Sequence, residues 1–99
     1  MKANFDSIIQ DSRPVVVDFH ATWCGPCKTQ SPIIKEVANE LGERVRVIKI
    51  DVEQNPTIAS RYQIQGVPTI MIFKEGQERY KQPGLHSKPQ LMQIIMNQL

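Results

Sequence analysis

The chain has 99 residues, of which 40% are hydrophobic and 22% charged, a balance typical of a single globular domain over residues 1–99. Its formal net charge of +2 comes from 12 basic and 10 acidic residues scattered along the sequence, which argues against a nucleic-acid-binding arm or a polybasic membrane patch. No apolar run is long enough to span a bilayer, and the first residues lack the apolar stretch of a secretion signal. We therefore expect a soluble, cytoplasmic protein.

The first part of the chain predicts a helix followed by a buried strand. Phe5, Ile8 and Ile9 fall at helical spacing and predict a short helix over residues 4–11. The β-branched run that follows predicts a strand from Val15 to Phe19, apolar almost throughout and therefore covered on both faces of a sheet.

The middle of the chain repeats this alternation. A longer helix with one apolar face is expected from about Cys24 to Leu41. Gly42 should end that helix, and Pro32 should kink it. The run Val45–Asp51 predicts a second buried strand, and a short helix should follow over residues 55–62, with a proline in its first turn.

The last third predicts a hairpin and a final helix. Thr69–Phe73 reads as an apolar strand, and a Glu-Gly turn joins it to the polar residues 77–81, which should form a charged edge strand. Ser87 and Gln90 resemble a capping box at the start of the last helix. The apolar face of this helix is expected to consist of Leu91, Ile94, Ile95 and Leu99.

This order of elements predicts an α/β fold. The first strand–helix–strand unit implies two parallel neighbours joined by a right-handed crossover. The hairpin adds an antiparallel pair, so we expect a mixed central sheet flanked by helices on both faces.

Both cysteines of the chain lie in the segment WCGPCK. Cys24 comes shortly after the first predicted strand and opens the next helix, at the sheet edge where open α/β sheets bind ligands. The free N–H groups and partial positive charge of a helix N-terminus stabilise a thiolate there. Cys27 lies one turn further along the same side of the helix, and Pro26 stiffens the turn between the two thiols.

Three interpretations of the pair compete. A structural role, as a stabilising disulfide or as two inert buried thiols, is disfavoured, because so short a loop restrains the unfolded chain little and an intracellular cysteine pair is more often catalytic or metal-binding. A zinc site would need two further ligands, and although His20 and His86 could formally supply them, their spacing does not support it. Dithiol–disulfide exchange is favoured, because side chains at i and i+3 form a bond that stays reducible.

The segments VVVDFHATWCGPCK, QNP and GVPTIMIFKEGQ resemble the thioredoxin family, and the similarity runs from about Val15 to the end of the sequence. The resemblance implies a thioredoxin fold and a general protein-disulfide reductase. It also implies a monomer without a bound cofactor, which receives electrons from NADPH through a flavoprotein thioredoxin reductase and passes them to disulfide-containing proteins. By position, Cys24 resembles the exposed nucleophile of the family and Cys27 its buried resolving thiol.

The resemblance also implies a substrate-binding surface around Cys24. The family's proline at the position of Pro68 is cis and packs against the dithiol, and the free backbone of Val67 suits pairing with an extended substrate segment. The apolar contact surface would comprise Trp23, Gly25, Pro26, Val67 and Gly84.

A carboxylate and an amine inside apolar strands are further candidates. Burial within VVVDF should raise the pKa of Asp18, and a carboxyl behind a dithiol could accept the proton of Cys27, the role proposed for the matching aspartate of the family. Lys49, alone within VRVIKI, is its natural charge partner. The alternatives are a partly solvated Asp18 at a strand end and a lysine that reaches from a strand into solvent.

Three features depart from the family pattern. His20 stands where the family usually has tryptophan; it is either a packing histidine or a source of positive potential that lowers the pKa of Cys24. The residues before the first helix are few, so the first strand of the family is expected to be short or missing here. Pro83 precedes Gly84 and could alter the substrate-facing loop.

A rival hypothesis from another class is a binding module in which the same apolar surface holds a fixed partner without turnover. Both hypotheses keep the surface, but only the enzyme needs both cysteines. Replacing Cys27 by serine should therefore trap mixed disulfides in an enzyme and leave binding by a module unchanged.

Overall fold

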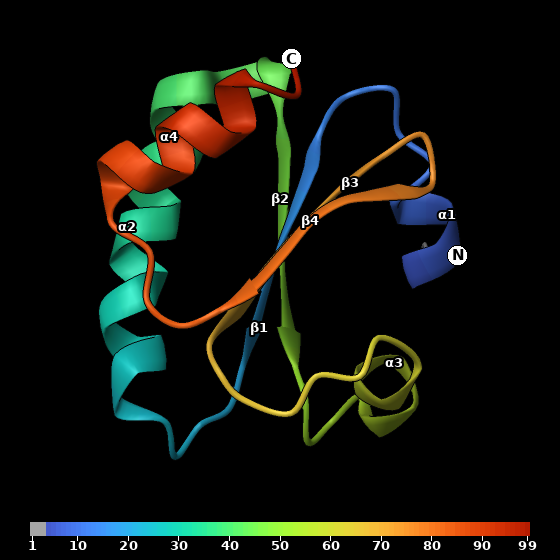
Figure 1. The fold of residues 1–99 in the computed structure, drawn as a ribbon, viewed down its shortest axis with the longest axis vertical. Helices are drawn as coiled ribbons and strands as arrows, with labels where there is room; N and C mark the ends of the chain where they lie inside the picture. The colour runs from blue at the N-terminus through green and yellow to red at the C-terminus, as the bar shows by residue number, and fades with distance from the viewer. Residues whose placement is uncertain (1–3) are drawn as a thin grey trace.

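A computed structural model describes residues 4–99 and contains one four-stranded mixed sheet (Figure 1). Its strands are β1 (Val15–His20), β2 (Arg46–Asp51), β3 (Thr69–Lys74) and β4 (Gln77–Pro83), in the order β2-β1-β3-β4. β1 runs parallel to β2 and antiparallel to β3, and β3 pairs antiparallel with β4. The predicted mixed sheet is confirmed, and the polar strand β4 lies at an edge. The prediction of a buried second strand is wrong, because β2 lies at the other edge and its side chains are half-buried or, at Lys49, exposed.

Helices cover both faces of the sheet, as expected. They are α1 (Phe5–Ile8), α2 (Gly25–Leu41), α3 (Pro56–Arg61) and α4 (Lys88–Met96), with a short 3-10 helix η1 (Gly42–Arg44) after α2. Figure 1 shows α2 and α4 on one side of the sheet and α1 and α3 on the other. None of the helices within residues 4–99 is long and apolar enough to cross a membrane.

The two faces hold separate hydrophobic cores, and β1 contributes to both. Val16 packs with the apolar stripes of α2 and α4, while Val17 and Phe19 pack on the other face with α1 and α3. The side chains of Val15–Phe19 are all buried. Asp18 lies on the same side of the strand as Val16, so its carboxylate is carried into the interior beneath α2.

Several boundaries differ from prediction for local reasons. α1 ends at Ile8, because the Asp11 carboxylate accepts the Arg13 N–H at 2.9 Å and turns the chain. The capping box of α4 is confirmed, but Leu99 does not belong to the apolar face: it lies beyond Met96 and is 46% exposed.

The start of the chain is anchored to the distant β3–β4 turn. Gly76 donates its N–H to the carbonyl of Ile9 at 2.8 Å, and Glu75 donates to the carbonyl of Asp11 at 3.0 Å. The expected short or missing first strand concerns in part residues 1–3, which lie outside the described residues. Within residues 4–99, no strand precedes α1.

Candidate active site

The two cysteines form a disulfide at the junction between β1 and α2. The Cα atoms of Cys24 and Cys27 are 5.3 Å apart. Cys24 is the N-cap of α2, and its Sγ accepts the backbone N–H of Cys27 at 3.1 Å. β1 ends just before this point, and Pro26 lies in the first turn of the helix. The Cys24 sulfur therefore lies where the first N–H groups of the helix have no partner within the helix and can bind it.

A second segment, from the loop before β3, lies against Cys24. The Val67–Pro68 peptide bond is cis, as the family resemblance implied. The carbonyl oxygen of Val67 lies 3.6 Å from Cys24 Sγ. The carbonyl of Pro68 accepts the N–H of Gly84 at 2.8 Å, which brings a third segment of the chain to the same end of the molecule.

The predicted contact residues surround this point with different exposures. Trp23 is 68% exposed, and Gly25, Pro26 and Gly84 are exposed as well. Val67 is half-buried. These side chains and backbone segments come from three separate parts of the sequence, and the structure brings all of them to the surroundings of Cys24.

Exposure does not distinguish the two cysteines, contrary to the expectation of an exposed nucleophile. Cys24 is 3% exposed and Cys27 is 4% exposed, because each sulfur is turned toward the other and covered by Ala21, Val52 and Val67. The two sulfurs differ instead in their surroundings. The sulfur of Cys24 caps the helix beside Val67, whereas Cys27 lines a pocket behind the disulfide.

Asp18 is fully buried, and both of its carboxylate oxygens lack a hydrogen-bond partner. Desolvation raises the pKa of Asp18, opposed by the positive charges of Lys49 and His20. The predicted burial is therefore confirmed. The alternative of a solvated aspartate at a strand end is wrong, because β1 continues to His20.

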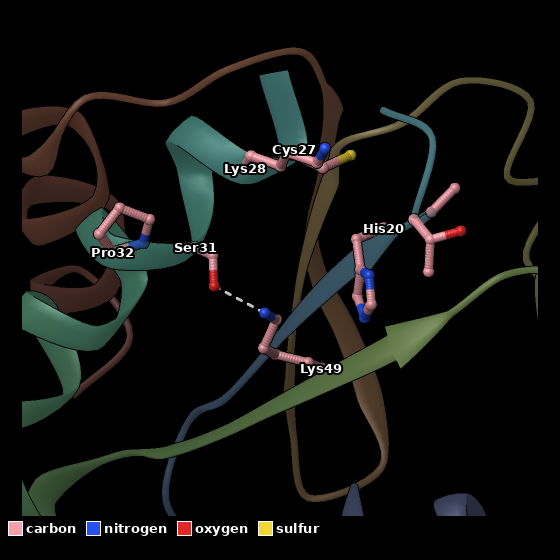
Figure 2. A pocket seen from close by; sticks show the side chains of 8 residues that line it. His20, Cys27, Lys28, Ser31, Pro32 and Lys49 are labelled. Atoms are coloured by element: carbon pink, nitrogen blue, oxygen red, sulfur yellow. Dashed lines mark hydrogen bonds between the residues drawn. The ribbon is translucent and has the colours of Figure 1, made fainter. Parts of the chain in front are cut away.

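Lys49 lies beside Asp18 without forming an ion pair with it. The two residues are register partners on β1 and β2, but the ammonium of Lys49 donates to the hydroxyl of Ser31 on α2 at 2.6 Å (Figure 2). The side chain of Lys49 is exposed, as the alternative of a lysine reaching into solvent predicted, and its positive charge opposes the rise in the pKa of Asp18. The serine was missed by sequence reasoning, since its partner is set by the packing of α2 across β2.

A pocket of about 490 Å³ opens behind the disulfide (Figure 2). Cys27 and His20 both line it, so the histidine lies close to the dithiol rather than in a core. Its influence on the pKa of Cys24 stays a prediction. The complete lining is His20, Ala21, Thr22, Cys27, Lys28, Ser31, Pro32 and Lys49.

The alternative of a metal centre finds no support in the geometry. Among the residues that the structure describes, no three His, Cys, Asp or Glu side chains gather as a ligand set. The second histidine, His86, is held in a hydrogen-bonded cluster with Gly84 and Tyr80.

The comparisons with known proteins agree with this site. The family model "Thioredoxin" matches residues 1–97. A thioredoxin-like protein of Synechocystis sp. is 45% identical over 94 residues, covering 94% of this chain and 90% of that protein. A thioredoxin of Rickettsia bellii is 39% identical over 94 residues, covering 95% and 90%. The solved structure of a mutant thioredoxin from Halobacterium salinarum superposes with a TM-score of 0.87 at 33% identity, covering 98% of this chain and 84% of that one.

The mixed sheet and the helix-capping cysteine pair define a thiol–disulfide oxidoreductase with the thioredoxin fold. The chain belongs to the thioredoxin family. It is a protein-disulfide reductase whose redox-active group is the Cys24–Cys27 disulfide, and disulfide-containing proteins are the substrate class of this family.

Proposed function

We propose that Cys24 is the nucleophile and Cys27 the resolving thiol. The observation that carries this assignment is the N-cap of α2, where the Cys24 sulfur accepts the N–H of Cys27 at 3.1 Å. In the reduced protein this sulfur would still accept that N–H and would still lie at the positive end of a 17-residue helix. Both interactions favour its thiolate form, and the thiolate is the attacking species in disulfide exchange.

The reaction then proceeds in two exchanges. The Cys24 thiolate attacks one sulfur of a substrate disulfide, forming a mixed disulfide and releasing the other substrate sulfur as a thiolate that takes up a proton. Cys27 loses its proton and attacks the sulfur of Cys24, which breaks the mixed disulfide and releases the second substrate thiol. Two electrons have passed to the substrate, and the internal disulfide has formed.

We assign the proton of Cys27 to Asp18 as acceptor, directly or through a water molecule. Support comes from burial and from the two oxygens of Asp18 that have no hydrogen-bond partner. The raised pKa makes this carboxylate a better base than an ordinary aspartate. Lys49, whose positive charge opposes the rise in the pKa of Asp18, favours the ionised form of the carboxyl that this task needs.

The exposed surface around Cys24 would hold the substrate. The indole of Trp23 and the backbone at Gly25, Pro26 and Gly84 offer apolar contact area, while Val67, before the cis Pro68, leaves backbone groups for strand-like pairing.

We further propose that NADPH, through a flavoprotein thioredoxin reductase, restores the dithiol and that the protein acts as a monomer in the cytoplasm. A reductant of protein disulfides has to be kept reduced, which a reducing compartment permits.

The test is to trap the intermediate. Cys27→Ser should accumulate a mixed disulfide with insulin as substrate, because the second exchange has no nucleophile, and multiple turnover should stop. Cys24→Ser is the matched control and should form no adduct. Adducts through Cys27 in the Cys24→Ser variant, with none in Cys27→Ser, would reverse the assignment.

A further inference from the structure

One polar side chain on α2 is fully buried, although the other buried residues of this helix are apolar. Gln30 lies one turn after Cys27 and is 0% exposed. Its amide nitrogen donates to the carbonyl of His86 at 3.0 Å, and its amide oxygen accepts the N–H of His86 at 2.7 Å. The side chain thus satisfies both backbone groups of a loop residue that is 56 positions away in the sequence.

The imidazole of His86 adds hydrogen bonds to the loop and to β4. We call the hydrogen-bonded set of Gln30, His86, Gly84 and Tyr80 the clamp. Its Nδ1 lies 2.9 Å from the carbonyl oxygen of Gly84, and its Nε2 lies 2.8 Å from the hydroxyl of Tyr80. Because a carbonyl can only accept, the neutral ring carries its proton on Nδ1 and accepts the Tyr80 hydroxyl at Nε2. His86 is 5% exposed, and both nitrogens of its ring have partners inside the protein.

The loop held by this clamp belongs to the surface around Cys24. Gly84 donates its N–H to Pro68, and the carbonyl of the preceding Val67 lies 3.6 Å from the Cys24 sulfur. One chain of hydrogen bonds therefore leads from α2 through His86 and Gly84 to the segment beside the disulfide. Between Gly84 and His86, the side chain of Leu85 is 49% exposed and faces solvent.

We propose that Gln30 is a positioning residue that fixes the loop of residues 84–86 relative to the helix carrying both cysteines. This inference rests on the proposed function, since it concerns the surface assigned to the substrate. Without the amide, the N–H and carbonyl of His86 would be left unpaired in the interior, and the loop would have to move to hydrate them. Substrate binding would suffer, whereas the cap on the Cys24 sulfur would stay intact.

The first experiment separates binding from chemistry. Pre-reduced Gln30→Leu should need about tenfold more insulin for half-saturation, the order expected when a buried hydrogen-bonded group loses its partner. Its limiting single-turnover rate, its rate with a small aromatic disulfide and the thiolate pKa of Cys24 should match the wild type. Gln93→Leu, the same change at an exposed position of α4, is the control and should alter nothing.

Two outcomes would overturn the proposal. An unchanged half-saturating concentration in Gln30→Leu would show that the clamp does not position the loop. An equal loss of rate with insulin and with the small disulfide would place the effect on the dithiol itself. In either case the wild type would still reduce insulin and Cys27→Ser would still trap it, so a failure here is distinct from a failure of the proposed function.

A conservative variant keeps the proposal testable if Gln30→Leu does not fold. In Gln30→Glu, the protonated carboxyl can both donate and accept, whereas the ionised carboxylate can only accept. The ratio of half-saturating insulin concentrations, variant over wild type, should therefore fall toward one as the pH is lowered from 8 to about 5. The titratable groups that the clamp connects, Tyr80 and His86, and the two thiols of the reduced site are common to both proteins. A ratio that does not change with pH would contradict the proposal.

Discussion

The sulfur of Cys24 occupies a position that helices usually give to an oxygen of Ser, Thr, Asp or Asn. A helix N-cap accepts hydrogen bonds from the first turn, and in α2 this acceptor is the sulfur that we propose as the nucleophile. Capping and nucleophilic activation are therefore the same interaction. A single turn of helix supplies the donor, the dipole and the resolving thiol at Cys27.

Asp18, the proposed proton acceptor, is a residue whose burial costs stability. Because desolvation raises its pKa in the folded protein, the folded state binds its proton more tightly than the unfolded state does. Asp18→Asn should therefore raise the free energy of unfolding of the oxidised protein at pH 7 by roughly 1–3 kcal/mol, because the neutral amide avoids the cost of burying a charge.

The sign follows from the proton balance. The stability cost of ionised Asp18 grows as the pH rises from the pKa of the carboxyl in the unfolded state toward its raised pKa in the folded state. Above that pKa the cost is constant. Denaturant unfolding of both proteins should thus show a difference at neutral pH that vanishes near pH 4 and below. Glu78→Gln, an exposed acid on β4, is the control. A difference that grew on acidification would contradict the account.

At the level of elements, the turn between β3 and β4 holds the N-terminal segment in place. Gly76 adopts a φ of +81°, and its N–H is bonded to the carbonyl of Ile9. A Cβ at Gly76 would also collide with the side chain of Gln10. Gly76→Ala should lower the free energy of unfolding by about 1–2 kcal/mol, because a left-handed backbone disfavours a side chain.

Gly66→Ala serves as the matched control, since its Cβ would meet nothing within 4 Å and its φ is not positive. The same substitution there should leave stability unchanged or raise it by up to about 1 kcal/mol. Equal losses in both variants, measured by denaturant unfolding, would contradict the role of the turn.

The elements that sequence reasoning predicted well are those fixed by local chemistry. The run Val15–Phe19, the helix end at Gly42 and the capping box of Ser87 with Gln90 each carry their signal within a few residues. The end of α1 was missed, because the turn at Asp11 competes with helix continuation.

The candidate site residues that could be predicted are those in the cysteine motif or in a segment that resembles the family. The cysteine pair and Asp18 lie in one contiguous segment, and the resemblance added Pro68 and Gly84. Gln30 could not be found in the same way, because its partner is a backbone segment that only the packed fold brings near. Lys49 was placed correctly beside Asp18, but its bond to Ser31 depends on how α2 crosses β2.

For the molecule as a whole, the fold gathers distant segments around one disulfide. The β1–α2 junction brings the cysteines, the loop before β3 brings the cis Pro68, and the loop after β4 brings Gly84. Two hydrophobic cores on opposite faces of the sheet hold these segments in one arrangement. In the proposed mechanism, reactivity then depends on the Cys24 sulfur at the start of α2.

The most direct measurement is the titration of Cys24 in the reduced protein, followed by thiolate absorbance and by the pH dependence of its alkylation, with Cys27→Ser to isolate its signal. The cap and the helix dipole should bring its pKa clearly below the value of about 8.5 of a free thiol, and Cys24 should be alkylated faster than free cysteine at neutral pH. A Cys24 pKa at or above that of free cysteine would contradict the account.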